Sequence, residues 1–194
     1  TILADPHYVR QIPPVGVRLF GAYFKDPINL ENLTTSLNVV LDASMMQRGL
    51  RLTNFKTEKN LSLDGSNVRG SIFLMRARID GSLFMEMGIF DSLDLNDARI
   101  GASFEASGSV FNDNLRLHRA EISGKVILTK ARLTTLSGWN ARLGASLEMR
   151  LADIRYGVDL SGATIAGDVR MQDATFGRLD GTACDWTPDR DVKD

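Results

Sequence analysis

Apolar residues recur every ten or eleven positions from about residue 17 to residue 182. Each unit reads h-x-h-x-x-A-x-h-x-G-x, where h is apolar and A is a small residue. Leu93–Ile100 and Val158–Ile165 are two clear examples. Alternation within h-x-h places both apolar side chains on one face of a short extended segment. Such segments are too short to be stable alone, but stacked segments bury a continuous apolar column and pair their backbones. The pattern therefore predicts a β-solenoid.

The first apolar column shows how regular the repeat is. Its members are Val17, Ile28, Val39, Leu50, Leu61, Ile72, Leu83, Leu93, Phe104, Leu115, Val126, Leu136, Leu147, Val158, Val169 and Leu179. One unit of eleven residues leaves too little interior for three apolar side chains, so two units of 21 or 22 residues are expected to form one four-sided coil. Sixteen units then give about eight coils. A helix would need apolar residues at i, i+3, i+4 and i+7, which this chain does not show.

A small residue two places before an apolar one, as in Ala98/Ile100, Ala163/Ile165 and Ala174/Phe176, resembles the pentapeptide-repeat proteins. The other half of each unit departs from that family, because its first slot holds Leu, Val or Ile and one residue is usually added. The resemblance covers most of the chain and implies an all-β, right-handed, four-sided parallel β-helix. A triangular β-helix of the bactofilin type is the alternative, and the regular alanine column favours four sides.

The repeat also suggests domain boundaries. Residues 1–16 are not periodic and contain Pro6, Pro13 and Pro14, which predicts an extended segment that caps the first coil. Residues 17–182 form the expected solenoid domain. Within it, residues 31–60 lose the alanine, so a bulged loop or a short helix is expected there. Residues 183–194 are interpreted as a C-terminal cap and tail, with Trp186 covering the last coil.

Composition narrows the functional classes. The chain has 194 residues, with 23 Lys and Arg against 24 Asp and Glu and a net charge of −1. This balance argues against a dedicated nucleic-acid binder. It also disfavours a gyrase-interacting DNA mimic, a role of some pentapeptide-repeat proteins that needs a strongly negative rod. A single cysteine, Cys184, excludes an internal disulfide framework and a cysteine-based zinc site.

The sequence also shows no targeting signal and no cofactor-binding motif. No apolar run approaches the ~18 residues of a membrane span, and no signal peptide is visible, so a cytoplasmic location is the default expectation. Membrane association would then require segments outside this chain. No phosphate-binding glycine loop occurs, and we predict no cofactor and no metal site.

Two outward-facing groups are candidates for interaction. The first is an apolar surface of Phe73, Phe84, Ile89 and Val110, which would suit a protein partner or a second copy of the chain. A local shift of register that covers Phe73 and Phe84 is the alternative. The second is a basic strip of Lys56, Arg78, Arg99 and Arg142, with Glu121 in the same column. It would suit an anionic partner, or it is an ordinary solvated face.

Catalysis is disfavoured by the sequence. Asp94 and Asp159 share a column but are not on adjacent coils, and a regular rod offers no cleft. The recurring serines Ser71, Ser82, Ser92 and Ser103 lack a base, and His118 stands alone. We therefore expect a non-enzymatic interaction or scaffold module of a bacterial pentapeptide-repeat-like protein. A self-assembling bactofilin-like scaffold and a gyrase-interacting mimic are alternatives, and an enzyme acting on polysaccharide is the least favoured.

Overall fold

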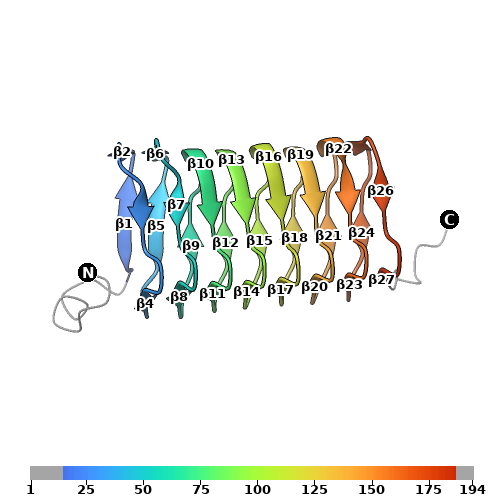
Figure 1. The fold of residues 1–194 in the computed structure, drawn as a ribbon, viewed down its shortest axis with the longest axis horizontal. Coiled ribbons are helices and arrows are strands. Elements are labelled where there is room, and N and C mark those ends of the chain that lie inside the picture. Colours follow the sequence, from blue (N-terminus) through green and yellow to red (C-terminus); the bar gives the residue numbers. More distant parts are fainter. Residues whose placement is uncertain (1–14, 187–194) are drawn as a thin grey trace.

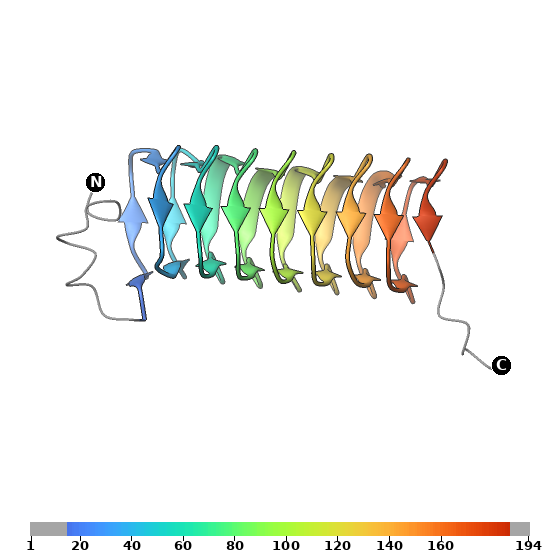
Figure 2. The same ribbon diagram turned by 90° about the horizontal axis from the view of Figure 1, so that it is seen from below.

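The computed structural model describes residues 15–186, which form one parallel β-solenoid that contains no helix. Strands of successive coils pair in parallel, with Val17 opposite Val39 and Leu83 opposite Phe104, so one coil is 21 or 22 residues. The chain rises at the back of Figure 1, crosses the top, descends in front and returns below while it advances to the right. The coil is therefore right-handed, and Figure 2 shows the same stacking from below. The predicted four-sided β-helix is confirmed.

We number the sides in the order in which the chain meets them. Side 1 is an eight-stranded sheet of β1 (Val17–Phe20), β5 (Val39–Asp42), β9 (Leu61–Ser62), β12 (Leu83–Phe84), β15 (Phe104–Glu105), β18 (Val126–Ile127), β21 (Leu147–Glu148) and β24 (Val169–Arg170). Side 4 is a second eight-stranded sheet of β4 (Thr34–Thr35), β8 (Lys56–Thr57), β11 (Arg78–Ile79), β14 (Arg99–Ile100), β17 (Glu121–Ile122), β20 (Arg142–Leu143), β23 (Thr164–Ile165) and β27 (Asp185–Trp186). Eight strands with seven steps between them make about seven full turns.

Sides 2 and 3 share one sheet, because five long strands bend across both. These are β10 (Asn67–Phe73), β13 (Ile89–Asp94), β16 (Val110–Arg116), β19 (Arg132–Ser137) and β22 (Asp153–Asp159). Side 2 is completed by β2 (Tyr23–Phe24), β6 (Met45–Met46) and β25 (Thr175–Phe176), and side 3 by β3 (Ile28–Asn29), β7 (Leu50–Arg51) and β26 (Leu179–Asp180). The bend coincides with a register shift, for example between Val68 and Ser71.

Small residues mark the corner that leads into side 4, as the sequence predicted. Alanines 77, 98, 120, 141 and 163 are buried there, each two residues before a buried apolar residue of side 4. The prediction of a loop or helix in residues 31–60 is wrong, because the regular coil continues through them. In these coils a large residue takes the alanine position and a smaller one takes the apolar position that follows. Buried Phe55 replaces alanine while Thr57 replaces the apolar residue, and Leu33 and Thr35 do the same one coil earlier. Because each exchange roughly conserves the local volume, the core stays filled.

The corner between sides 3 and 4 is a turn that needs a left-handed residue. In the coil of Leu74, the N–H of Ala77 donates to the carbonyl of Leu74 at 3.0 Å, and Arg76 between them has a φ of 56°. A positive φ at the third residue is characteristic of a type II turn. The equivalent residues Asn32, Asn54, Asp97, Arg119 and Asn140 have φ between 53° and 59°. Asn and Asp tolerate this conformation best among non-glycine residues.

The C-terminal boundary expected at residue 182 is wrong. Ala183 again has a positive φ of 55°, and Asp185 and Trp186 form β27, which pairs with Thr164 and Ile165. Half-buried Cys184 takes the small corner position, and this burial raises the pKa of its thiol. The solenoid therefore runs at least to Trp186. The proposed segments 1–16 and 183–194 otherwise lie outside the described residues, apart from residues 15 and 16.

Glycines that follow the apolar residue of side 4 lie where two coils touch. A Cβ on Gly101 would be 2.3 Å from the carbonyl oxygen of Asp80, one coil earlier. That oxygen belongs to a backbone held on both sides by interstrand hydrogen bonds, so it cannot move away easily. Gly181 lies near the end of the rod, and a Cβ there would meet only the Cβ of Cys184, at 3.9 Å. Neither glycine has a positive φ, so the two positions differ in available space alone.

We therefore expect Gly101→Ala to lower the free energy of unfolding by about 1–3 kcal/mol, the usual range for overpacking. Gly181→Ala is the matched control and is expected to leave stability within about 0.5 kcal/mol of the parent. Equilibrium urea denaturation followed by far-ultraviolet circular dichroism measures both variants. Equal stability of the two would show that the contact at Gly101 can relax.

Candidate functional site

The structure separates the four residues of the predicted apolar surface. Ile89 and Val110 are paired neighbours on side 2, whereas Phe84 points outward from side 1 and Phe73 from side 3, both half-buried. Phe73 and Phe84 occupy equivalent places eleven residues apart, which is half a coil, so they face opposite directions. The four residues do not form one surface. Phe73 and Phe84 pair with Arg51 and Ser62 of the preceding coil at the regular step of 22 residues, and both are half-buried.

Side 2 instead carries an outward column that is apolar on four of its first five coils and is interrupted once, by Asn67. Its outward residues stack in register as Tyr23, Met45, Asn67, Ile89 and Val110. Tyr23 is 63% exposed, Ile89 is 45% exposed, and Met87 next to this row is 75% exposed. We call Tyr23, Met45, Met87, Ile89 and Val110 the apolar strip. The sequence analysis missed Tyr23 and Met45, although a step of 22 residues back from Ile89 leads through Asn67 to both.

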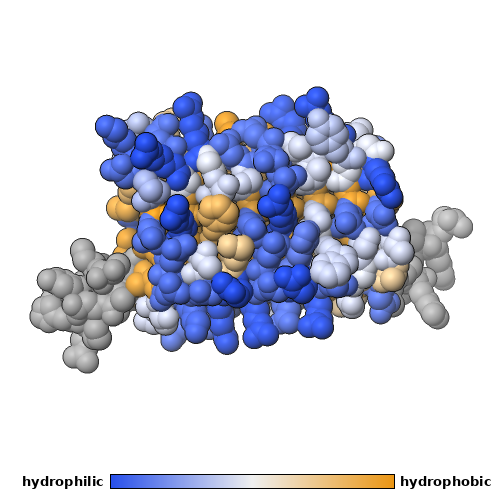
Figure 3. All heavy atoms as spheres, in the orientation of Figure 1, coloured by the Kyte–Doolittle hydropathy of each residue, from blue (hydrophilic) through white to orange (hydrophobic). Residues whose placement is uncertain are grey.

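Beyond Val110 the character of side 2 changes. The same column continues with Arg132, Asp153 and Thr175, all exposed. Side 3, seen from the front in Figure 3, is mainly hydrophilic, with hydrophobic residues at its N-terminal end, near its middle and in a narrow line toward its C-terminal end. The apolar strip is therefore confined to one side and one half of the rod. Segregation of this kind is typical of a surface used for contact with another molecule.

The predicted basic strip is in register but is not free. Lys56, Arg78, Arg99, Glu121 and Arg142 stack on side 4 in the expected order. Glu121 accepts from Arg99 at 3.0 Å and from Arg142 at 3.1 Å, and Arg78 pairs with Asp80 at 2.8 Å. Three of the four predicted cations thus have a carboxylate partner. Exposed pairs of this kind contribute little stability but neutralise the surface.

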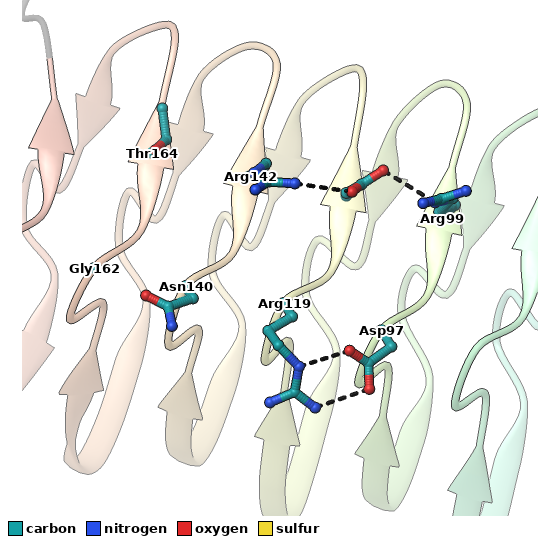
Figure 4. Close-up of a pocket in the computed structure, with 8 residues that line it drawn as sticks. Asp97, Arg99, Arg119, Asn140, Arg142, Gly162 and Thr164 are labelled. Atoms are coloured by element: carbon teal, nitrogen blue, oxygen red, sulfur yellow. Dashed lines mark hydrogen bonds and ion pairs between the residues drawn. The ribbon is translucent and has the colours of Figure 1, made fainter.

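A groove of about 470 Å³ runs beside this column, along the corner between sides 3 and 4 (Figure 4). Asp97 and Arg119 form a two-pronged ion pair across it, with N–O distances of 2.6 and 2.8 Å. The hydrogen bonds from Arg119 lower the pKa of the Asp97 carboxyl, and the same pair raises the pKa of Arg119. Three arginines and two carboxylates line the groove together with Asn140 and Thr164. This near-neutral lining does not favour a polyanion.

Side chains with catalytic chemistry are mostly engaged in structure. Ser82 and Ser103 accept backbone N–H groups of the following coil, and Ser92 donates to Ser71 at 2.9 Å. Nε2 of His118 lies 2.7 Å from the hydroxyl oxygen of Ser137, and burial lowers the pKa of that histidine. Within residues 15–186, no group of three His, Cys, Asp or Glu side chains could hold a metal ion.

Asp94 and Asp159 are separated as the sequence predicted. The register places Arg116 and Ser137 between them, one residue on each intervening coil. Three strand steps of ~4.8 Å separate their backbones by ~14 Å, farther apart than the paired carboxylates of glycosidases. The two acids are therefore not brought together as a catalytic pair.

Comparison with protein-family models finds no match, and comparison with curated proteins finds no significant relative. In the described part of the chain there is also no helix long and apolar enough to cross a membrane. The family resemblance therefore rests on the repeat pattern and on the shape of the coil.

Carboxylates of successive coils are stacked where side 1 ends. The N–H of Asp64 donates to Asp42, and the N–H of Glu86 donates to Asp64 at 2.7 Å. Partial burial raises the pKa of Asp64; the hydrogen bond from Glu86 opposes this, and the charges of Asp42 and Glu86 add to it. Burial also raises the pKa of nearby Glu105, helped by the charges of Glu86 and Asp64. Ionisation of Asp64 is therefore less favourable in the folded state than in the unfolded chain.

Asp64→Asn keeps the acceptor oxygen for Glu86 and removes the charge, so it is expected to stabilise the protein at pH 7. Because Asp64 is only half-buried, solvent screening limits the gain to about 0.5 kcal/mol. Asp64 has a folded-state pKa above its unfolded value, so the parent regains this stability as the pH falls through it. The difference between variant and parent should therefore shrink at acidic pH, as measured by urea midpoints at pH 7 and below.

Asp97→Asn is the control, for which we expect the opposite change in stability at pH 7. The pKa of Asp97 is lowered, so its contribution is present at pH 7 and is lost as the pH falls through the lowered value. This variant should be less stable than the parent at pH 7, and Asn suits the positive φ at that position. Destabilisation at pH 7 by Asp64→Asn would contradict our account of the stacked carboxylates.

Proposed function

We propose that this chain is a non-enzymatic interaction scaffold of the pentapeptide-repeat type, and that the apolar strip is its docking surface. The observation that carries the proposal is the alignment of four apolar residues in one outward column that Asn67 interrupts once, with Met87 beside it. The four are Tyr23, Met45, Ile89 and Val110. Rigid backbone pairing fixes their spacing before any partner binds. Binding therefore requires little ordering of the scaffold itself, which favours recognition.

The occupant we propose is a second copy of the chain. The strip itself contains no charged residue, so its apolar side chains can meet those of a second copy directly. Arg69 and Asp91, which follow Asn67 and Ile89 by two residues on the same side, would lie at the edge of that contact. Five coils at ~4.8 Å make a strip ~20 Å long. A few hundred Å² of apolar surface is less than the ~800 Å² per partner of a stable complex. The expected association is therefore weak and concentration-dependent.

The matched pair Met87→Asp and Leu151→Asp tests this function. Both residues are exposed, at 75% and 51%, and both have left-handed backbone, with φ of 55° and 57°. Asp tolerates that conformation, so neither change should unfold the protein. Only Met87 belongs to the apolar strip, and therefore only Met87→Asp should weaken association, by about tenfold or more in the dimer dissociation constant.

Sedimentation velocity from micromolar to millimolar concentration measures the effect. The parent and Leu151→Asp should show a mass that rises with concentration, while Met87→Asp stays monomeric over most of the range. Ile89→Asp provides a second variant within the strip. A parent that keeps the monomer mass throughout, or equal loss in Met87→Asp and Leu151→Asp, would exclude the strip as the site of self-association.

Assembly end to end, as in bactofilin-like scaffolds, is the second candidate. It is favoured by the partial exposure of core positions in the first and last described coils, such as Leu19 at 40% and Leu179 at 45%. Among the strands within residues 15–186, those at the two ends of each sheet pair on one side only, and such edges are a common cause of strand addition. Such assembly would grow into a series of oligomers rather than stop at a dimer, and Met87→Asp would not affect it.

A further inference from the structure

A second hollow lies on side 3, over the C-terminal coils and away from the apolar strip. This groove of about 340 Å³ is lined chiefly by Ser137, Tyr156, Asp159, Arg178 and Asp180, together with the backbone of β19 and β22. Its lining combines one aromatic wall with hydroxyl, carboxylate and guanidinium groups. Neither the repeat nor the proposed scaffold function accounts for this composition.

Two large aromatic side chains stand exposed at opposite edges of side 3. Tyr156 is 59% exposed and lies where β22 turns from side 2 onto side 3. Trp139 is 44% exposed and follows Ser137 by two residues, at the corner that leads to side 4. The two are on adjacent coils, because Ser137 pairs with Asp159. The outward column between them is polar, so the aromatic rings border a polar floor.

Both rings are held in place by their neighbours. The guanidinium of Arg119 lies 5.8 Å from the centroid of the Trp139 ring, and the His118 ring packs edge-on at 6.4 Å. Arg119 is itself fixed by its two-pronged ion pair with Asp97. On the other edge, Arg155 lies 5.2 Å from the ring of Tyr156. Rings positioned before a ligand arrives lose little conformational freedom on binding.

The backbone beside Tyr156 is also tightly packed. A Cβ on Gly157 would be 2.6 Å from the carbonyl oxygen of Arg178 on the next coil. The residue after Tyr156 can therefore approach that coil only because it is glycine. This close approach fixes the place at which Tyr156 leaves the sheet.

The groove has more hydrogen-bond acceptors than positively charged groups. Oδ1 of Asp159 accepts the N–H of Ser161 at 2.9 Å, and Asp180 accepts from Thr182 and from Arg178. A carboxylate has about four acceptor positions, so Asp159 retains capacity for a further donor, whereas Asp180 already accepts four hydrogen bonds from Ser161, Arg178 and Thr182. Two carboxylates against one arginine disfavour an anionic ligand and suit hydroxyl groups, which donate as well as accept.

We propose that this groove binds a neutral oligosaccharide whose chain runs along the solenoid axis. A pyranose ring presents a face of C–H groups that packs against an aromatic ring and a rim of hydroxyl groups that reaches carboxylates. The groove spans three successive coils through the stacked residues Ser137, Asp159 and Asp180, which sets the direction of the bound chain. Tyr156 lines the groove, and Trp139 stands at the opposite edge of side 3.

Isothermal titration calorimetry with cellohexaose, chitohexaose and mannohexaose tests the proposal. We expect saturable binding of at least one of the three, weakened about tenfold or more by Trp139→Ala and by Tyr156→Ala. Phe20→Ala is the matched control, since Phe20 is 60% exposed but lies on side 1, outside both the groove and the apolar strip. Asp159→Asn keeps the side-chain shape and the acceptor for Ser161, and it should weaken binding severalfold without affecting the fold.

Oligogalacturonate serves as the anionic comparison, and circular dichroism checks that each variant is folded. No binding of any neutral hexasaccharide at millimolar concentration would overturn the proposal. Unchanged affinity in both aromatic variants and Asp159→Asn would do so too, as would tighter binding of oligogalacturonate. If the aromatic variants fail to fold, Asp159→Asn decides the outcome alone. The result is independent of self-association, because the groove and the apolar strip lie on different sides.

Discussion

Backbone hydrogen bonding between coils at a fixed step of 21 or 22 residues is the constraint on which the rest of this structure depends. Each coil can pair with its neighbours only if its inward residues fill the same space as those of the coil before. An alanine with an apolar residue two positions later fills this space, and so does Phe55 with Thr57 two positions later. The close approach of neighbouring coils also explains why Gly101 has no room for a Cβ.

That constraint also organises the surface. Side chains one coil apart are stacked, so charge and hydrophobicity along each side follow from residues 21 or 22 positions apart. Glu121 between Arg99 and Arg142 shows the consequence, because a repulsive row of arginines becomes a pair of ion pairs. The stacked carboxylates around Asp64 show the opposite case, in which burial, helped by the repulsion that remains, raises the pKa of Asp64.

A solenoid in which each coil contacts only its neighbours can carry separate sites without coupling them. The apolar strip occupies the N-terminal half of side 2, and the groove lined by Tyr156 and Asp159 occupies the C-terminal half of side 3. The surface proposed for self-association and the groove proposed for glycan binding are separated in this way, and the rigid rod fixes the distance between them.

The sequence by itself determined the all-β solenoid, the length of the coil, the stacking of Lys56, Arg78, Arg99, Glu121 and Arg142, and the separation of Asp94 from Asp159. These features follow from a period, and a period is visible in one chain. Only the tertiary structure decided that Phe73 and Phe84 face apart, that residues 31–60 stay regular and that the coil continues through Trp186. It also placed Tyr156 in a groove with Asp159 and Asp180, and Trp139 at the opposite edge of side 3, because the corners that direct these side chains depend on backbone turns and on contacts between coils.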